Sequence, residues 1–88
     1  MNRHDDFLCY MDAAKRRNEP RKGPIELCDR SKVVAGIREE SDETVDEMFF
    51  QLKRKWEGKP VDKEKVKREA ADLGRWAYGA WAWAERNL

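Results

Sequence analysis

The sequence predicts an all-α fold, and two observations support that prediction. Apolar residues recur at helical spacing, and no stretch shows the alternation of apolar and polar residues, with β-branched enrichment, that is typical of strands. Breaks that contain both proline and glycine occur at residues 19–24 and 58–60. We therefore expect a single domain over residues 1–88, with helices at about residues 5–18, 30–54 and 62–87.

The first helix is indicated by apolar residues on one face and basic residues at its end. Phe7, Leu8, Met11 and Ala14 follow helical spacing. Residues 15–17 are all basic, which suits the negative end of a helix dipole. The stretch 19–24 holds two prolines and a glycine, and we expect it to be a loop.

The second helix is expected to begin at Asp29 or Ser31, because both are good N-cap residues. At about 100° per residue, its apolar residues fall on one broad arc, which we expect to be buried. Glu40, Glu43 and Glu47 lie along one edge of that arc. The arc consists of Val33, Val34, Ile37, Val45, Met48, Phe49, Leu52 and Trp56.

The third helix is expected to be capped by Asp62, with Glu69 and Trp76 on one face and Asp72 beside them. From Trp76 to Ala84 it is apolar almost all the way round. A helix of this kind needs neighbours on several sides, and two short helices provide few. We therefore expect the chain to form a helical bundle by dimerisation or tetramerisation, with this helix in the interface.

Charge and cysteine content restrict the classes of function. The 19 Lys and Arg residues nearly balance the 18 Asp and Glu residues, so the net charge of +1 gives no support for nucleic-acid binding. Two cysteines, Cys9 and Cys28, do not make a disulfide framework. No apolar run is long enough to cross a bilayer. We expect a cytoplasmic protein without a membrane or nucleic-acid partner.

The acids form two short patterns that predict a metal site. Residues 39–43 read Glu-Glu-Ser-Asp-Glu, and residues 69–72 read Glu-Ala-Ala-Asp. Carboxylates three positions apart are neighbours on a helix. Two such pairs on facing helices would repel each other unless a cation lay between them. Oxygen ligands favour Mg²⁺, with Mn²⁺ as the alternative, so we expect Glu40, Glu43, Glu69 and Asp72 to bind it.

Those two patterns, separated by residues 44–68, resemble the signature of the all-α NTP pyrophosphohydrolases, the MazG-like superfamily, over about residues 30–84. The resemblance implies a magnesium-dependent homodimer or homotetramer that converts a nucleoside triphosphate and water into the monophosphate and pyrophosphate. It assigns the metal to Glu40, Glu43, Glu69 and Asp72. Glu39 then orients the attacking water or supports the ligands, and either Glu39 or Glu43 accepts the proton.

A triphosphate needs cations, and a base needs an aromatic slot. Lys65 lies about one turn before Glu69 and Arg68 directly before it, and Arg17 belongs to a basic group near the first loop. The remaining candidate cations are Arg16, Arg21 and Lys22, and the candidate rings are Phe50, Trp76 and Trp83. The alternative function is a non-catalytic helical oligomer that binds a protein or a nucleotide. A nucleic-acid binder using the basic loop is a third, weaker alternative.

A single site imposes a geometric condition on the second and third helices. Counted from a turn at residues 58–60, the first acid pair lies ~15 residues back and the second ~9 residues forward, an offset of ~9 Å at helical rise. We therefore expect either that the second helix ends early, near residues 51–54, or that the two helices cross steeply.

Overall fold

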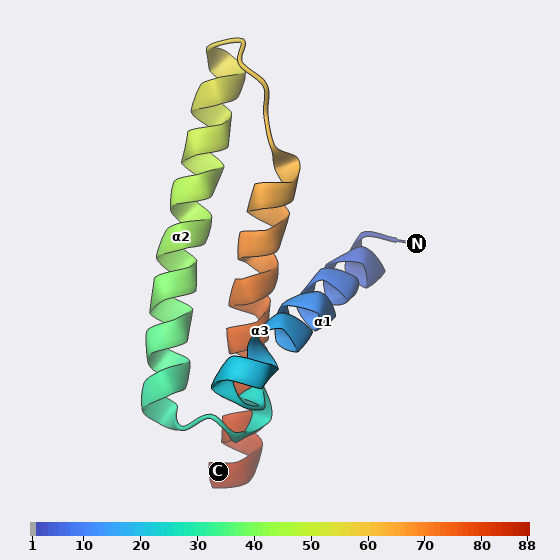
Figure 1. Cartoon of the computed structure of the whole chain (residues 1–88). Coiled ribbons are helices and arrows are strands. Elements are labelled where there is room, and N and C mark those ends of the chain that lie inside the picture. The colour runs from blue at the N-terminus through green and yellow to red at the C-terminus, as the bar shows by residue number, and fades with distance from the viewer. Residues whose placement is uncertain (1) are drawn as a thin grey trace.

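The computed structural model describes residues 2–88 and confirms an all-α chain with three α-helices. Helix α1 spans Arg3–Lys22, a short 3₁₀ turn η1 spans Ile25–Leu27, α2 spans Arg30–Trp56 and α3 spans Lys63–Asn87. Helices α2 and α3 form a long hairpin, and α1 packs across α3 with its N-terminal end pointing away (Figure 1). Of the elements described in residues 2–88, α3 contacts each of the other three.

Helix α1 corrects one prediction, because it continues through the segment expected to be a loop and includes Pro20. Proline in a helix interior costs about 3 kcal/mol or more, largely because it removes a hydrogen bond and crowds the preceding turn. Here Pro20 lies in the last turn, where few further bonds are lost. The helix ends at Gly23, whose N–H donates to the Glu19 carbonyl at 2.8 Å.

The starts of α2 and α3 agree with the predicted caps. The Asp29 carboxylate accepts a hydrogen bond from the Lys32 N–H at 2.9 Å, and the Asp62 carboxylate accepts from the Glu64 and Lys65 N–H groups. Each cap satisfies backbone donors that a helix start leaves unpaired. Of the two alternatives for α2, the early end near residues 51–54 is wrong, because the helix is unbroken through Trp56.

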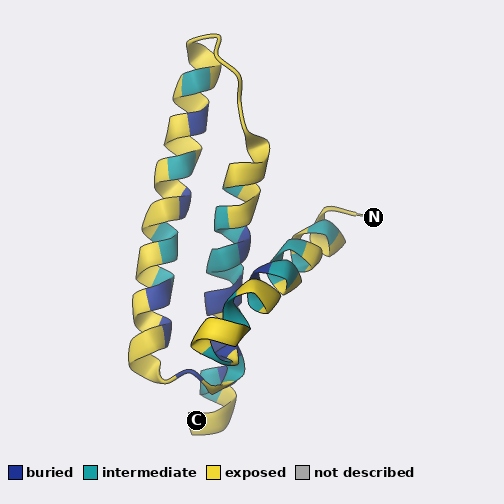
Figure 2. Cartoon of the chain, in the orientation of Figure 1, coloured by how far each residue is buried: buried dark blue, intermediate teal, exposed yellow. Residues whose placement is uncertain are grey.

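The core lies at the end of the molecule opposite the α2–α3 turn, where η1 packs against α3 and α1 (Figure 2). Ile25, Cys28, Val33 and Trp76 form it, and Trp76 is only 7% exposed. The Trp76 indole lies directly against Gly36 of α2: a Cβ atom added there would stand 2.2 Å from the ring. Gly36 therefore sets how closely α2 and α3 approach.

Neighbours within the chain account for much of the apolar surface of α3. Trp76 and Ala82 are buried, because α1, α2 and η1 all pack on this helix. Trp81 remains exposed. The expectation that the Trp-rich stretch lies in a subunit interface stays a prediction, and Trp81 is the ring that remains open to a partner.

The apolar arc of α2 is only partly buried, which corrects a second prediction. Val33 packs in the core, whereas the later members of the arc are exposed. In that half of α2 the buried positions are polar, Thr44 and Gln51. The exposed members are Val34, Val45, Met48, Phe49, Leu52 and Trp56.

Candidate metal centre

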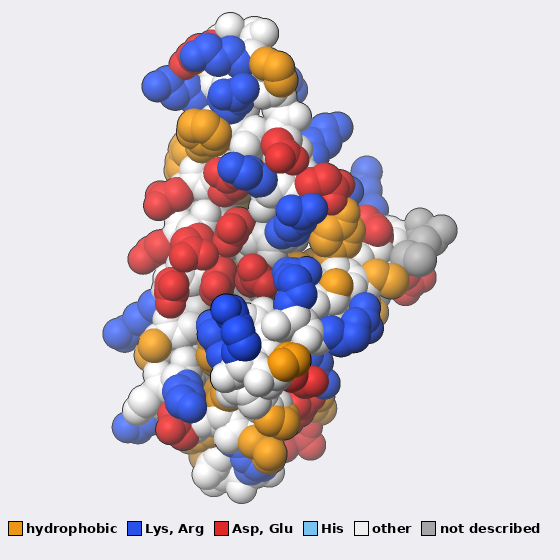
Figure 3. Space-filling view, in the orientation of Figure 1, with side chains coloured by type: hydrophobic (Ala, Val, Ile, Leu, Met, Phe, Trp, Pro, Cys, Tyr) orange, Lys and Arg blue, Asp and Glu red, His pale blue; other side chains and the backbone are white. Residues whose placement is uncertain are grey.

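Three of the four predicted ligands converge between α2 and α3. Glu40, Glu43 and Glu69 each place a carboxylate oxygen within 4.8 Å of the other two. Glu40 and Glu43 are neighbours because they are three positions apart on α2, and Glu69 faces them from α3. Acidic side chains gather in the middle of the face where these helices meet, with Lys and Arg side chains around them (Figure 3).

The geometric condition on the hairpin is met by an extended linker. After the turn at Gly58, residues 59–62 are non-helical and run back alongside α2 (Figure 1). An extended residue advances about 3.3 Å and a helical one 1.5 Å, so four residues recover about 7 Å of the expected offset. Glu69 therefore reaches the Glu40 and Glu43 pair, although α2 does not end early.

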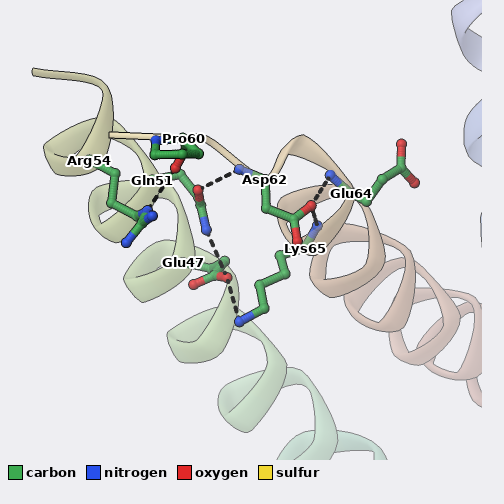
Figure 4. A network of polar contacts seen from close by, with 7 residues as sticks. All are labelled: Glu47, Gln51, Arg54, Pro60, Asp62, Glu64 and Lys65. Atoms are coloured by element: carbon green, nitrogen blue, oxygen red, sulfur yellow. Dashed lines mark hydrogen bonds and ion pairs between the residues drawn. The ribbon is translucent and has the colours of Figure 1, made fainter. Parts of the chain in front are cut away.

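Side chains of α2 fix that linker in place (Figure 4). The Gln51 carbonyl oxygen accepts a hydrogen bond from the Asp62 N–H at 2.8 Å, and its amide donates to Glu47 at 3.3 Å. Arg54 Nε donates to the Pro60 carbonyl at 2.7 Å. Because Gln51 is buried, these bonds set the register of α3 against α2, and with it the position of Glu69.

Burial and mutual repulsion perturb the converging acids. Burial, followed by the charges of Glu43 and Asp72, raises the pKa of Glu40 to about 8. Burial and the neighbouring Glu43 also raise the pKa of Glu69. One oxygen each of Glu40 and Glu69 is buried without a hydrogen-bond partner among the described residues. Near neutral pH the cluster therefore either retains a proton or takes up a cation.

Asp72 lies beside this cluster on the side nearer α1, and it is not among the three converging groups. Burial raises the pKa of Asp72, while the charges of Arg17, Arg75 and Lys22 oppose that rise. Arg17 Nη2 lies 3.6 Å from Asp72 Oδ1, an oxygen that is itself buried and receives no hydrogen bond from the part of the chain that the structure describes. Asp72 thus joins an acidic half of the site to a basic half.

Arg75 is a site neighbour that sequence reasoning missed. It is only 2% exposed, and its Nε has no hydrogen-bond partner within residues 2–88. Its guanidinium lies 4.5 Å from the Trp76 ring centroid, a cation–π contact. A cation three residues after Asp72 was readable in the sequence, but its burial depends on how α3 packs.

Phe50 and Lys65 lie where a ligand of the acid cluster would extend. They line a surface hollow of about 530 Å³ together with Glu43 and Glu69. Phe50 is exposed, and Lys65 Nζ lies 4.0 Å from Glu47 (Figure 4). A ring and a cation therefore border the carboxylates on this side.

Other predicted residues lie elsewhere. Glu39 is exposed and is not among the converging acids. Arg68 and Arg17 line a separate hollow between α1 and α3. Trp76 is a core residue and offers no open ring to a base. Among the remaining candidates, Arg16, Arg21 and Lys22 are exposed and Trp83 is half-buried.

Comparisons with protein-family models, curated proteins and solved structures find no match. Within residues 2–88, none of the helices combines the length and apolar character needed to cross a membrane.

Proposed function

We propose that this chain is a magnesium-dependent nucleoside triphosphate pyrophosphohydrolase of the MazG-like type. It would convert a ribo- or deoxyribonucleoside triphosphate and water into the monophosphate and pyrophosphate, as a cytoplasmic homo-oligomer. The observation that supports this best is the convergence of Glu40, Glu43 and Glu69 from two helices, with two of their oxygens buried and unpartnered. The sequence pattern of residues 39–43 and 69–72 points to the same reaction.

The donor set suits a hard divalent cation. Carboxylate oxygens are the ligands that Mg²⁺ prefers, and its remaining positions stay open to water and phosphate. Bound there, Mg²⁺ would neutralise phosphate charge and lower the pKa of a coordinated water. Glu40, Glu43 and Glu69 would hold it, and each would be ionised in that state. Asp72 would complete the set from the side of Arg17.

A carboxylate with an oxygen that is not bound to the cation would accept the proton from the attacking water. Water attacks the α-phosphorus, and the bond from that phosphorus to the α–β bridging oxygen breaks. Pyrophosphate leaves with the bridging oxygen, and the water proton passes to a carboxylate. We assign this role to Glu43: Glu43 and Glu69 both lie in the cluster and border the hollow, and Glu43 is the more exposed of the two. Glu39 would orient the attacking water or support the metal ligands from outside the cluster.

The hollow beside the cluster accounts for the rest of the substrate. Lys65 would meet phosphate oxygens, and the exposed Phe50 ring would stack on the base. Arg17 and Arg68 border the opposite side and would contact phosphates only from there. Trp76, being buried, would act through packing alone.

The test is pyrophosphate and monophosphate release from each common NTP and dNTP with Mg²⁺. We expect at least one substrate to turn over, with activity lost in Glu43→Gln and Glu69→Gln. Glu85→Gln is the matched control, because Glu85 is an exposed acid on α3 away from the cluster. Failure of all substrates, or equal activity of all variants, would contradict the proposal.

A non-catalytic helical oligomer is the second candidate, and the exposed apolar half of α2 favours it. In that case the acid cluster would share a proton and need no cation. The two candidates differ in one readout: only the enzyme loses function when the converging carboxylates become amides.

A further inference from the structure

Helix α2 exposes a continuous apolar surface that nothing in residues 2–88 covers. Its residues, here the α2 apolar face, are Val45, Met48, Phe49, Leu52 and Trp56, extended across the linker by Val61. Phe49 is 69% exposed and Trp56 is 77% exposed. The spacing of these residues along α2 is that of a helix seam that packs on another helix.

The area is large for a small monomer. Aromatic side chains measure about 150–250 Å² each and the aliphatic ones somewhat less, so these exposed fractions amount to roughly 500–600 Å². That reaches the upper end of the largest apolar patches on ordinary monomers. A standard interface buries about 800 Å² per partner, so the α2 apolar face and its rim suffice for one.

The surface around the α2 apolar face is hollowed. A hollow of about 510 Å³ lies between the C-terminal half of α2 and the start of α3, lined by Met48, Leu52, Val61 and Val66. Phe49 also lines this hollow and is largely exposed. A second copy related by a twofold axis near Met48 and Phe49 would insert its own Phe49 into this hollow while receiving the other.

The charges beside the face specify the direction of the second copy. Taking Val45 as zero and about 100° per residue, Asp42, Asp46 and Lys53 lie at about 60°, 100° and 80°, on one flank. All three are exposed. In an antiparallel pair the same flanks meet, and Lys53 falls opposite position 44 of its partner, between Asp42 and Asp46. In a parallel pair this flank would meet the opposite flank of the partner, so Lys53 would not meet Asp42 or Asp46.

We propose that the α2 apolar face binds a second copy of this chain in an antiparallel arrangement, which forms a four-helix bundle from two α2–α3 hairpins. Lys53 exchanges its intrachain ion pair with Glu57, at 3.7 Å, for contacts with the partner's acids. The interface therefore lies on α2, away from the Trp-rich part of α3. The acid cluster occupies a different face of α2, so dimerisation and hydrolysis can be tested apart.

The first experiment is analytical ultracentrifugation of the full chain across a concentration series. We expect a dimer for the natural chain and at least a 100-fold weaker association for Phe49→Glu. Trp81→Glu is the matched control, because Trp81 is an exposed aromatic residue on α3 outside the face. Circular dichroism establishes that each variant is helical, and Phe49→Ala repeats the test with a milder change.

The second experiment tests the antiparallel register through charge reversal. Lys53→Glu should weaken the dimer about tenfold, because it places like charges on the rim at two symmetric positions. Adding Asp42→Lys and Asp46→Lys to that variant should restore the association. A natural chain that is monomeric at all concentrations overturns the proposal. So does a dimer broken by Trp81→Glu and not by Phe49→Glu, or a charge reversal without rescue.

Discussion

Replacing Glu40 by Gln should stabilise the protein at pH 8 when no divalent cation is present. Burial raises the pKa of Glu40 from the ordinary 4.5 to about 8. The folded state therefore retains a proton that the unfolded chain gives up between those two values. The free energy of unfolding that depends on the Glu40 proton is highest below about pH 4.5 and falls as the pH rises toward 8. A neutral Gln amide at this position removes this loss.

The magnitude follows from that difference in pKa. About 3.5 pH units correspond to about 5 kcal/mol, as an upper limit for a fully dry group. Glu40 is half-buried, and solvent screening reduces this to ~1–2 kcal/mol. For a domain of this size, such a change raises the melting temperature by ~5–10 °C.

Thermal melting by circular dichroism at pH 5 and pH 8, in the presence of a chelator, measures this effect. The Glu40→Gln variant should melt at a higher temperature than the natural chain at pH 8 and at nearly the same temperature at pH 5. The Glu85→Gln control should follow the natural chain at both. A Glu40→Gln variant that melts at or below the natural chain at pH 8 would refute the electrostatic account of the cluster.

Three further substitutions test how the site is positioned. Gly36→Ala should destabilise the protein by ~1–3 kcal/mol in urea unfolding, because the added Cβ meets the Trp76 ring; a gain in stability, as helix propensity alone gives, would contradict the packing. Gln51→Ala should cost ~1–2 kcal/mol in the same measurement by releasing the Asp62 N–H, and no loss would show that the linker is held otherwise. Arg17→Ala should change stability by less than ~0.5 kcal/mol yet raise the KM for a triphosphate several-fold, and an unchanged KM would remove this cation from the substrate site.

The sequence predicted what depends on local chemistry. The caps at Asp29 and Asp62 follow from side chains that satisfy nearby backbone donors, and both were found. The pairing of Glu40 with Glu43 follows from helical periodicity alone. Pro20 was misjudged because a proline in the last turn disrupts less of the helix than one in its interior.

Features that depend on tertiary contacts were beyond the sequence. Periodicity identifies the apolar arc of α2, but it does not reveal that α3 covers the side bearing Thr44 and Gln51. The meeting of Glu69 with the α2 acids depends on an extended linker held by Gln51. The burial of Arg75 similarly depends on the packing of α3, and Trp76 proved to be core because of its contact with Gly36.

The most direct test of the central claim is Mn²⁺ binding followed by electron paramagnetic resonance, with Mg²⁺ as competitor. The claim is that Glu40, Glu43 and Glu69 together hold a divalent cation. We predict saturable binding per chain, displaced by Mg²⁺, retained in Glu85→Gln and weakened at least tenfold in Glu43→Gln and in Glu69→Gln. No saturable binding, or equal binding by all these variants, would contradict it.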